Sequence, residues 1–192
     1  GYELAQSPKS DQRFRRLFDA HESAMREYCS RRLGGYDAND ATAEIFVVAW
    51  RRIDEVPTGD DARLWLYGVA RNVVRNVSRS HNRRVRLGIL TSSTPRTPVP
   101  AVEDVVIRRH EDRLVLQAMA KLSDDDQELL RLQLWEELSR AQIGEVLGIS
   151  AEAVGSRLKR AKKRVTKHLK SVGLGPMGSS RHIAAEGKAT NE

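Results

Sequence analysis

The fold is decided by a stretch in the C-terminal third of the chain, residues 139–161, which reads SRAQIGEVLGISAEAVGSRLKRA. Apolar residues recur at helical spacing on both sides of a central Gly-Ile-Ser, as they do in two short helices that pack against each other. Gly144 lets the helices approach closely, Gly148 can adopt the positive φ of the turn, and Ser150 can cap the second helix. The stretch therefore predicts a helix-turn-helix.

The second helix of this motif has an outward side without large apolar residues. That side carries Glu152, Gly155, Ser156, Lys159 and Arg160. From 139 to 170 the chain has nine Lys or Arg residues and two acidic residues, an imbalance too large for a solvated face held by salt bridges. We predict that this helix enters the major groove of a nucleic acid, because two packed helices in an ordinary bundle would not need this charge.

Helical periodicity continues before the motif. A helix is expected from about Val105 to Leu122, and Ser123 is expected to cap the next one. Ser139 and Gln142 form a capping box that starts the helix-turn-helix. Residues 171–192 carry glycine and small polar residues without apolar periodicity, which is typical of a mobile tail.

The sequence changes character between the two halves of the chain. Residues 88–102 contain three prolines and a run of hydroxyl residues, a composition that blocks helix continuation. We place a flexible linker at 87–103, a first domain at 12–86 and a second domain at 104–170. The predicted fold class is all-α, with two small helical domains, the C-terminal one containing the helix-turn-helix.

The first domain is expected to hold three helices. Apolar residues at helical spacing predict the first over 12–33. The second is expected to begin with Asp37 or Asn39 as its cap and to end before Pro57, and the third to begin near Asp60 or Asp61.

A second basic surface lies on the third helix. Arg71, Arg75, Arg79 and Arg83 recur at steps of four, and no acidic residue occurs between 71 and 86. We call these four arginines the basic stripe; on a helix they would follow a phosphate backbone, whereas a merely solvated face would suffer repulsion between them. Beside the stripe are two amides that can pair with base edges, Asn72 and Asn76.

Composition limits the remaining choices. The chain of 192 residues has a formal net charge of +7, which favours a polyanionic partner. No apolar run approaches the roughly 20 residues of a membrane span, so a cytoplasmic protein that does not bind a membrane is expected. A single cysteine, Cys29, excludes a disulfide or Cys-based zinc site within the chain and suggests a buried thiol. The sequence shows no catalytic, cofactor-binding or metal-binding motif, so an enzyme is not expected.

Three segments resemble the extracytoplasmic-function (ECF) sigma factors of the sigma-70 family. Residues 38–51, ANDATAEIFVVAWR, and 65–72, WLYGVARN, resemble their second conserved region, and residues 154–161, VGSRLKRA, resemble the recognition helix of their fourth. The resemblance covers about 12–169, in the order of that family and with a proline-containing linker.

This resemblance implies a factor that binds core RNA polymerase and directs promoter recognition, promoter opening and transcription initiation. The polymerase contacts would be the clamp helices of the largest subunit and the flap, with Asp40, Glu44 and Arg51 on the clamp-binding helix. The minus-ten DNA would be met by Asn72, Arg75, Asn76, Arg79 and Arg83. The minus-thirty-five DNA would be met by Arg140, Ser156, Arg157, Lys159 and Arg160. Inhibition by an anti-sigma factor is a common arrangement in that family.

Two other functions are compatible with parts of the sequence. A helix-turn-helix repressor or activator would place a sensing or dimerising domain in residues 12–86, where the basic stripe has no obvious use. An RNA-binding protein fits the charge but leaves the helix-turn-helix unexplained.

Overall fold

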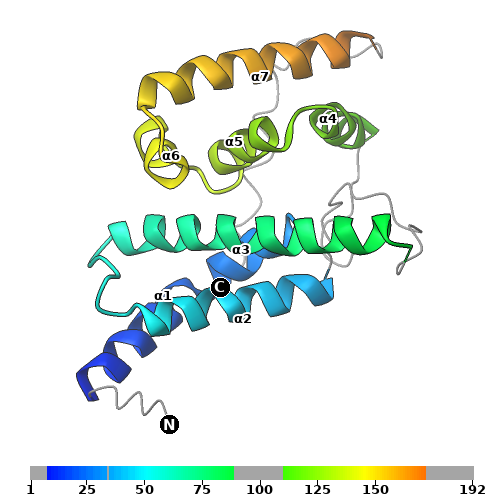
Figure 1. Cartoon of the computed structure of the whole chain (residues 1–192). Helices are drawn as coiled ribbons and strands as arrows, with labels where there is room; N and C mark the ends of the chain where they lie inside the picture. Colours follow the sequence, from blue (N-terminus) through cyan, green and yellow to red (C-terminus); the bar gives the residue numbers. More distant parts are fainter. Residues whose placement is uncertain (1–7, 34, 89–109, 172–192) are drawn as a thin grey trace, which may run out of the picture.

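The computed structural model describes residues 8–33, 35–88 and 110–171, and within these parts the regular structure is entirely helical (Figure 1). The seven helices are α1 (Pro8–Ser30), α2 (Gly35–Arg51), α3 (Asp61–Arg86), α4 (His110–Ala120), α5 (Asp124–Leu134), α6 (Arg140–Leu147) and α7 (Ala151–Ser171). The all-α prediction is confirmed. Except for Leu87, Gly88 and Ser171, the expected linker and tail lie outside the described residues.

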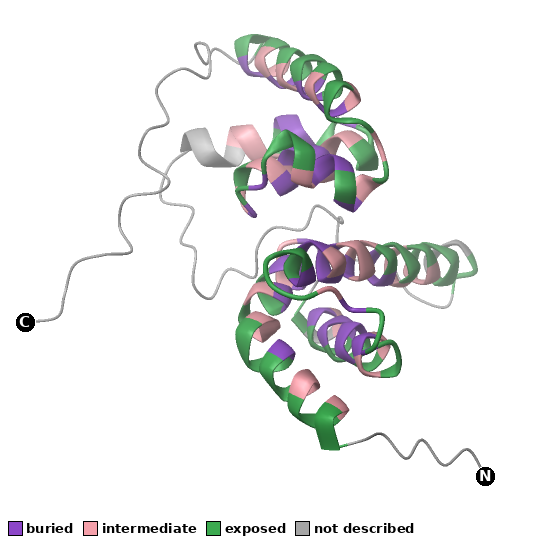
Figure 2. Ribbon diagram, turned by 90° about the vertical axis from the view of Figure 1, so that its left-hand side faces the viewer, coloured by how far each residue is buried: buried purple, intermediate pink, exposed green. Residues whose placement is uncertain are grey.

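Helices α1, α2 and α3 pack around one apolar core. Met25, Tyr28 and Leu66 are fully buried in it, and the buried parts of the three helices face one another (Figure 2). Towards the start of α1, Phe14 contacts Phe46 and Trp50 edge-on, with ring centroids 6.4 and 4.9 Å apart. The thiol of Cys29 is buried as expected, and burial raises its pKa.

The helix boundaries differ in part from those predicted. Helix α1 begins at Pro8, a residue whose fixed φ suits the first position of a helix. Helix α2 begins at Gly35, so neither Asp37 nor Asn39 caps it, and that prediction was wrong. Asp37 instead lies in the first turn, where a negative charge still meets the positive end of the helix dipole. The predicted start of α3 at Asp61 is confirmed.

Helix α7 organises the second half of the chain by packing against α4, α5 and α6. Its buried side is formed by Val154, Leu158, Ala161, Val165 and Leu169. On α5, Leu132 is fully buried whereas Leu134 is 49% exposed. Residues two apart lie on nearly opposite sides of a helix, so Leu134 lies on the solvent-facing side of α5.

The two halves of the chain pack against each other. Helix α3 lies between α1 and α2 on one side and α5 and α6 on the other, and α7 lies on the face of the second half that is remote from α3 (Figure 1). None of the described helices combines the length and apolar character that a bilayer crossing requires.

Candidate nucleic-acid interface

Two glycines set the geometry of the predicted helix-turn-helix. A Cβ on Gly144 would lie 2.5 Å from the carbonyl oxygen of Ile149, so only glycine allows the turn to pass this close to α6. Gly148 ends α6 with φ +68° and donates from its N–H to the end of the helix. Both roles expected from the sequence are confirmed.

Side-chain caps fix where both helices of the motif begin. The Ser139 hydroxyl accepts a hydrogen bond from Gln142 N, while the Gln142 side chain accepts one from Ser139 N, at 3.3 and 2.9 Å. Ser150 accepts from Ala153 N at 3.2 Å. The capping box and the Ser150 cap predicted from the sequence are therefore both present.

The outward side of α7 borders an open groove of about 490 Å³. Arg140, Ser156 and Lys159 line this groove, and all three are exposed. Arg157 and Arg160 are exposed on α7 but do not line it. The structure thus brings together three of the five residues predicted for this site and leaves two flanking it.

Contacts that local sequence patterns do not reveal complete this face. The Arg140 side chain covers Gly155, with Nη1 3.5 Å from where a Cβ would stand. Gln133 and Lys162 also line the groove. Farther along α7, Arg164 is not a free cation, because its guanidinium donates to Asp126 of α5 at 2.9 Å.

The basic stripe on α3 is only partly free. Arg75, Arg79 and Arg83 are exposed. Arg71, in contrast, has a side chain only 20% exposed and lies 3.5 Å from the carboxylate of Asp125. The expectation of four uncompensated arginines was wrong at this position, because an acidic residue of another helix supplies the missing charge.

The polar residues of α2 and α3 share a second groove, of about 330 Å³. Asp40 and Glu44 of α2 line it together with Asn76 of α3, whereas Asn72 and Arg51 are exposed outside it. The structure therefore joins residues that the sequence assigned to two different contacts. His81 and Arg84 also line this groove, and the sequence analysis gave them no role there.

Two sequence profiles match the chain: Sigma-70 region 2 over residues 17–84 and Sigma-70 region 4 over residues 112–165. The ECF RNA polymerase sigma factor SigL of Mycobacterium tuberculosis is 30% identical over 162 residues, which cover 83% of this chain and 90% of SigL. The chain belongs to the ECF sigma factors.

Other comparisons agree with this sigma-factor family. The Probable RNA polymerase sigma factor RfaY of Xanthomonas campestris pv. campestris is 30% identical over 135 residues; the match covers 69% of this chain and 34% of the length of RfaY. The fold resembles that of the sigma factor RpoE from Bartonella quintana, solved with the anti-sigma factor NepR, with a TM-score of 0.63, 22% identity and coverage of 82% and 96% of the two chains. Family membership makes this sigma factor a DNA-binding regulator of transcription initiation and disfavours a stand-alone repressor.

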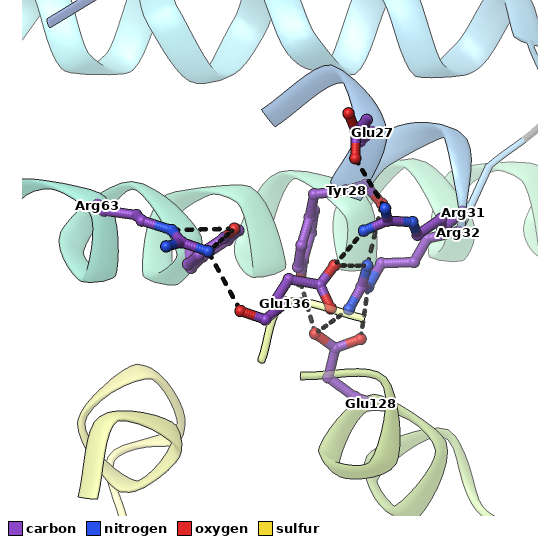
Figure 3. Close-up of polar contacts among 8 residues, drawn as sticks. Glu27, Tyr28, Arg31, Arg32, Arg63, Glu128 and Glu136 are labelled. Atoms are coloured by element: carbon purple, nitrogen blue, oxygen red, sulfur yellow. Dashed lines mark hydrogen bonds and ion pairs between the residues drawn. The ribbon is translucent and has the colours of Figure 1, made fainter. Parts of the chain in front are cut away.

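A buried polar cluster joins the two halves of this sigma factor (Figure 3). The Arg32 guanidinium at the end of α1 donates to Glu128 at 2.7 Å and to Glu136 at 2.9 Å. The Tyr28 hydroxyl donates to Glu128 at 2.6 Å, and the Arg32 guanidinium stacks 3.5 Å from the Tyr28 ring centroid. We call Tyr28, Arg32, Glu128 and Glu136 the interdomain cluster.

Glu128 and Arg32 of the interdomain cluster keep their charges despite burial. Burial would raise the pKa of Glu128, but the positive charge and hydrogen bonds of Arg32 outweigh it and hold that pKa below its ordinary value. Burial would also lower the pKa of Arg32, yet Tyr28, Glu128 and Glu136 together raise it. Burial and the negative charge of Glu128 keep Tyr28 protonated by raising its pKa. An ion pair between the domains therefore persists at neutral pH.

Proposed function

We propose that the two domains of this sigma factor divide promoter recognition between them. Residues 12–86 would bind core RNA polymerase and open the minus-ten element, residues 104–170 would bind the minus-thirty-five duplex, and residues 87–103 would connect them. The observation that carries this proposal is that Asn72 and Asn76 on α3, and Ser156 and Lys159 on α7, are all exposed on different domains.

For the minus-thirty-five duplex we propose a division of labour along α7. Ser156 and Lys159, which line the groove beneath Arg140, are placed to reach base edges in the major groove. Arg157 and Arg160, exposed beside the groove, would bind phosphates and fix the orientation of the helix. The flap of the polymerase would contact this same domain.

For the minus-ten strand we propose that Asn72 and Asn76 pair with the edges of unstacked bases, with Arg75, Arg79 and Arg83 along the backbone. A base turned out of the duplex exposes its pairing edge to polar side chains. Asp40, Glu44 and Arg51, all exposed on α2, would bind the clamp helices. The groove between α2 and α3, which Asp40, Glu44 and Asn76 line, would couple polymerase binding to capture of the strand.

The packed arrangement of the two domains must open for this function. The two promoter elements lie roughly 25 base pairs apart, about 85 Å of duplex at about 3.4 Å per pair. Among the described helices, α4, α5 and α6 form a single layer between α3 and α7 (Figure 1), and a helix with its side chains is about 10–12 Å wide. The 23 residues between Arg86 and His110 reach about 75 Å when fully extended, enough for the domains to separate.

One further partner follows from the family. RpoE was solved in complex with an anti-sigma factor, and we infer that a protein of this class controls the present sigma factor as well. A protein that acts with core polymerase on promoter DNA would work in the cytoplasm, and we infer that location for this sigma factor.

The proposal is tested by transcription in vitro with core polymerase on a library of promoter templates. We expect protein-dependent transcripts, and we expect the double variant Asn72→Ala, Asn76→Ala to lose them while still binding polymerase. The control is the variant Gln12→Ala, Gln117→Ala, which removes one exposed amide from α1 and one from α4. Reactivity of unpaired thymines to permanganate locates the defect at promoter opening. If no template gives a protein-dependent transcript and the protein binds bare duplex tightly, the protein would instead be a repressor.

A further inference from the structure

The basic stripe continues beneath the second domain. Stepping back four residues at a time from Arg71 leads to Tyr67 and Arg63 on the same side of α3. Tyr67 is buried, and Arg63 donates to the backbone oxygen of Glu136 at 3.2 Å (Figure 3). The second domain therefore contacts the N-terminal half of this side and leaves Arg75, Arg79 and Arg83 in solvent.

The end of α1 adds two cations to the contacted half. Arg31 lies 3.5 Å from Glu136, and the Arg32 side chain, only 2% exposed, is held by Glu128 and Glu136. We call Arg31, Arg32, Arg63 and Arg71 the cationic interdomain face. It is one surface with the basic stripe, since Arg71 belongs to both.

The second domain meets this face with acidic side chains. Asp125 faces Arg71, Glu128 faces Arg32, and Glu136 faces both Arg31 and Arg32. A carboxylate and a phosphate accept the same paired hydrogen bonds from a guanidinium. Three carboxylates of the second domain thus pair with guanidinium groups that could otherwise bind phosphates.

We propose that the cationic interdomain face binds the phosphate backbone of promoter DNA, and that Asp125, Glu128 and Glu136 of the second domain occupy it until the domains separate. This inference rests on the proposed function, because it extends the DNA path of the first domain. Packing of the domains would then be autoinhibitory, since DNA and the second domain compete for one set of arginines.

The contact between the two domains is weak enough for DNA to displace it. Two polar atoms in or beside it, Glu136 Oε2 and Arg131 Nε, are buried without a hydrogen-bond partner. Buried ion pairs also contribute little net stability, because desolvation offsets most of their attraction. Duplex DNA offers a continuous row of phosphates and releases condensed counterions when they are neutralised, so it can replace three carboxylates.

The first measurement asks whether the acidic residues hold the domains together. Dyes on Ser23→Cys and Lys121→Cys, two exposed positions in different domains, report domain separation in the full chain, and the buried Cys29 remains unlabelled. The variant Asp125→Asn, Glu128→Gln, Glu136→Gln should lower energy transfer with helix content unchanged. Unchanged transfer would overturn the proposal.

The second measurement asks whether the uncovered face binds DNA. Without polymerase, the triple variant should bind a promoter-free duplex more tightly than wild type, with a salt slope steeper by about 0.9 for each arginine that gains a phosphate. Adding Arg31→Ala, Arg63→Ala and Arg71→Ala should remove that gain. A gain that survives these changes would overturn the proposal.

Two controls separate this result from simpler explanations. The variant Asp11→Asn, Asp19→Asn, Asp54→Asn removes the same charge from exposed positions outside the contact, and an equal gain in duplex affinity there would refute a local effect. If the triple variant loses helix content, the single variant Asp125→Asn replaces it in the duplex assay. The Asp125 side chain is 66% exposed, so this substitution should leave the fold intact and raise duplex affinity. Promoter-dependent transcription by the wild-type protein checks the proposed function independently, because the duplex assay contains no polymerase.

Discussion

The two basic surfaces of this sigma factor differ in what lies against them. The outward side of α7 faces solvent, and Ser156, Lys159 and Arg160 are exposed there. On α3, the second domain contacts Arg63 and Arg71 of the corresponding surface and leaves its C-terminal half free. Two helices with similar charge can therefore differ in their readiness for DNA.

The difference arises from the side by which each helix is anchored. An apolar row that includes Val154 and Leu158 holds α7 to its own domain, so its polar side has no other partner. Helix α3 packs on α1 and α2 through one side and meets α6 of the second domain through another. A helix that contacts two domains has less surface free for a third partner.

The largest change in the free energy of unfolding is expected when the interdomain cluster is broken. Replacing Arg32 by alanine leaves Glu128 and Glu136 buried without a counter-charge, which costs about 3–5 kcal/mol for such a pair. We expect urea unfolding, followed by circular dichroism, to show a loss of that order or two separate transitions. Arg79→Ala, an exposed arginine of the basic stripe, should change the free energy of unfolding by less than about 0.5 kcal/mol. Equal effects of the two variants would contradict the comparison.

The sequence predicted the α7 surface far better than the α3 surface. Every determinant of the helix-turn-helix is local: the capping box, the close approach at Gly144 and the turn at Gly148 lie within ten residues. Arg32, in contrast, pairs with residues 96 and 104 positions away. No periodicity connects such distant positions, so charge counting along one helix could not show that Arg71 is compensated.

One other error has a local cause. The start of α2 was assigned to the best capping residue, although the helix extends back to Gly35 and holds Asp37 in its first turn. Among the site residues, the sequence did not indicate that Asp40, Glu44 and Asn76 share a groove, because that depends on how α2 packs against α3.

Acid should weaken the contact between the second domain and the α3 surface. Glu128 has a lowered pKa in the folded protein. The ionised side chain therefore contributes its full stabilisation at pH values above the ordinary carboxyl pKa of 4.5. This stabilisation is lost as the pH falls through the lowered pKa. Tyr28, Arg32 and Arg131 surround it, and its protonation leaves Arg32 with Glu136 alone.

The expected result is domain separation at acid pH in the dye-labelled chain, before helix content falls. Protonation of Glu128 should destabilise the protein less than Arg32→Ala does, because Glu136 still pairs with the Arg32 guanidinium. Glu128→Gln should abolish this pH dependence by removing the titrating group. If the domains of Glu128→Gln separate along the same pH curve as wild type, the pH dependence belongs to other carboxylates.

The smallest effects on stability are expected within the second domain. There, two glycine-to-alanine changes should shift the stability in opposite directions. Gly144→Ala puts a Cβ 2.5 Å from the Ile149 oxygen, and such overpacking costs about 1–3 kcal/mol. Gly155→Ala meets only the Arg140 side chain at an ordinary 3.5 Å, while it removes the roughly 1 kcal/mol penalty of glycine inside a helix.

Thermal unfolding of the two glycine variants sharpens the contrast between a position fixed by backbone contact and one bordered by a movable side chain. We expect a lower melting temperature for Gly144→Ala and a higher one for Gly155→Ala. Because the added methyl of Gly155→Ala lies under Arg140 at the edge of the groove, its binding to minus-thirty-five duplex should stay close to wild type. A loss of duplex affinity in this more stable protein would mean that DNA approaches the Gly155 backbone, which would extend base contact one position beyond Ser156.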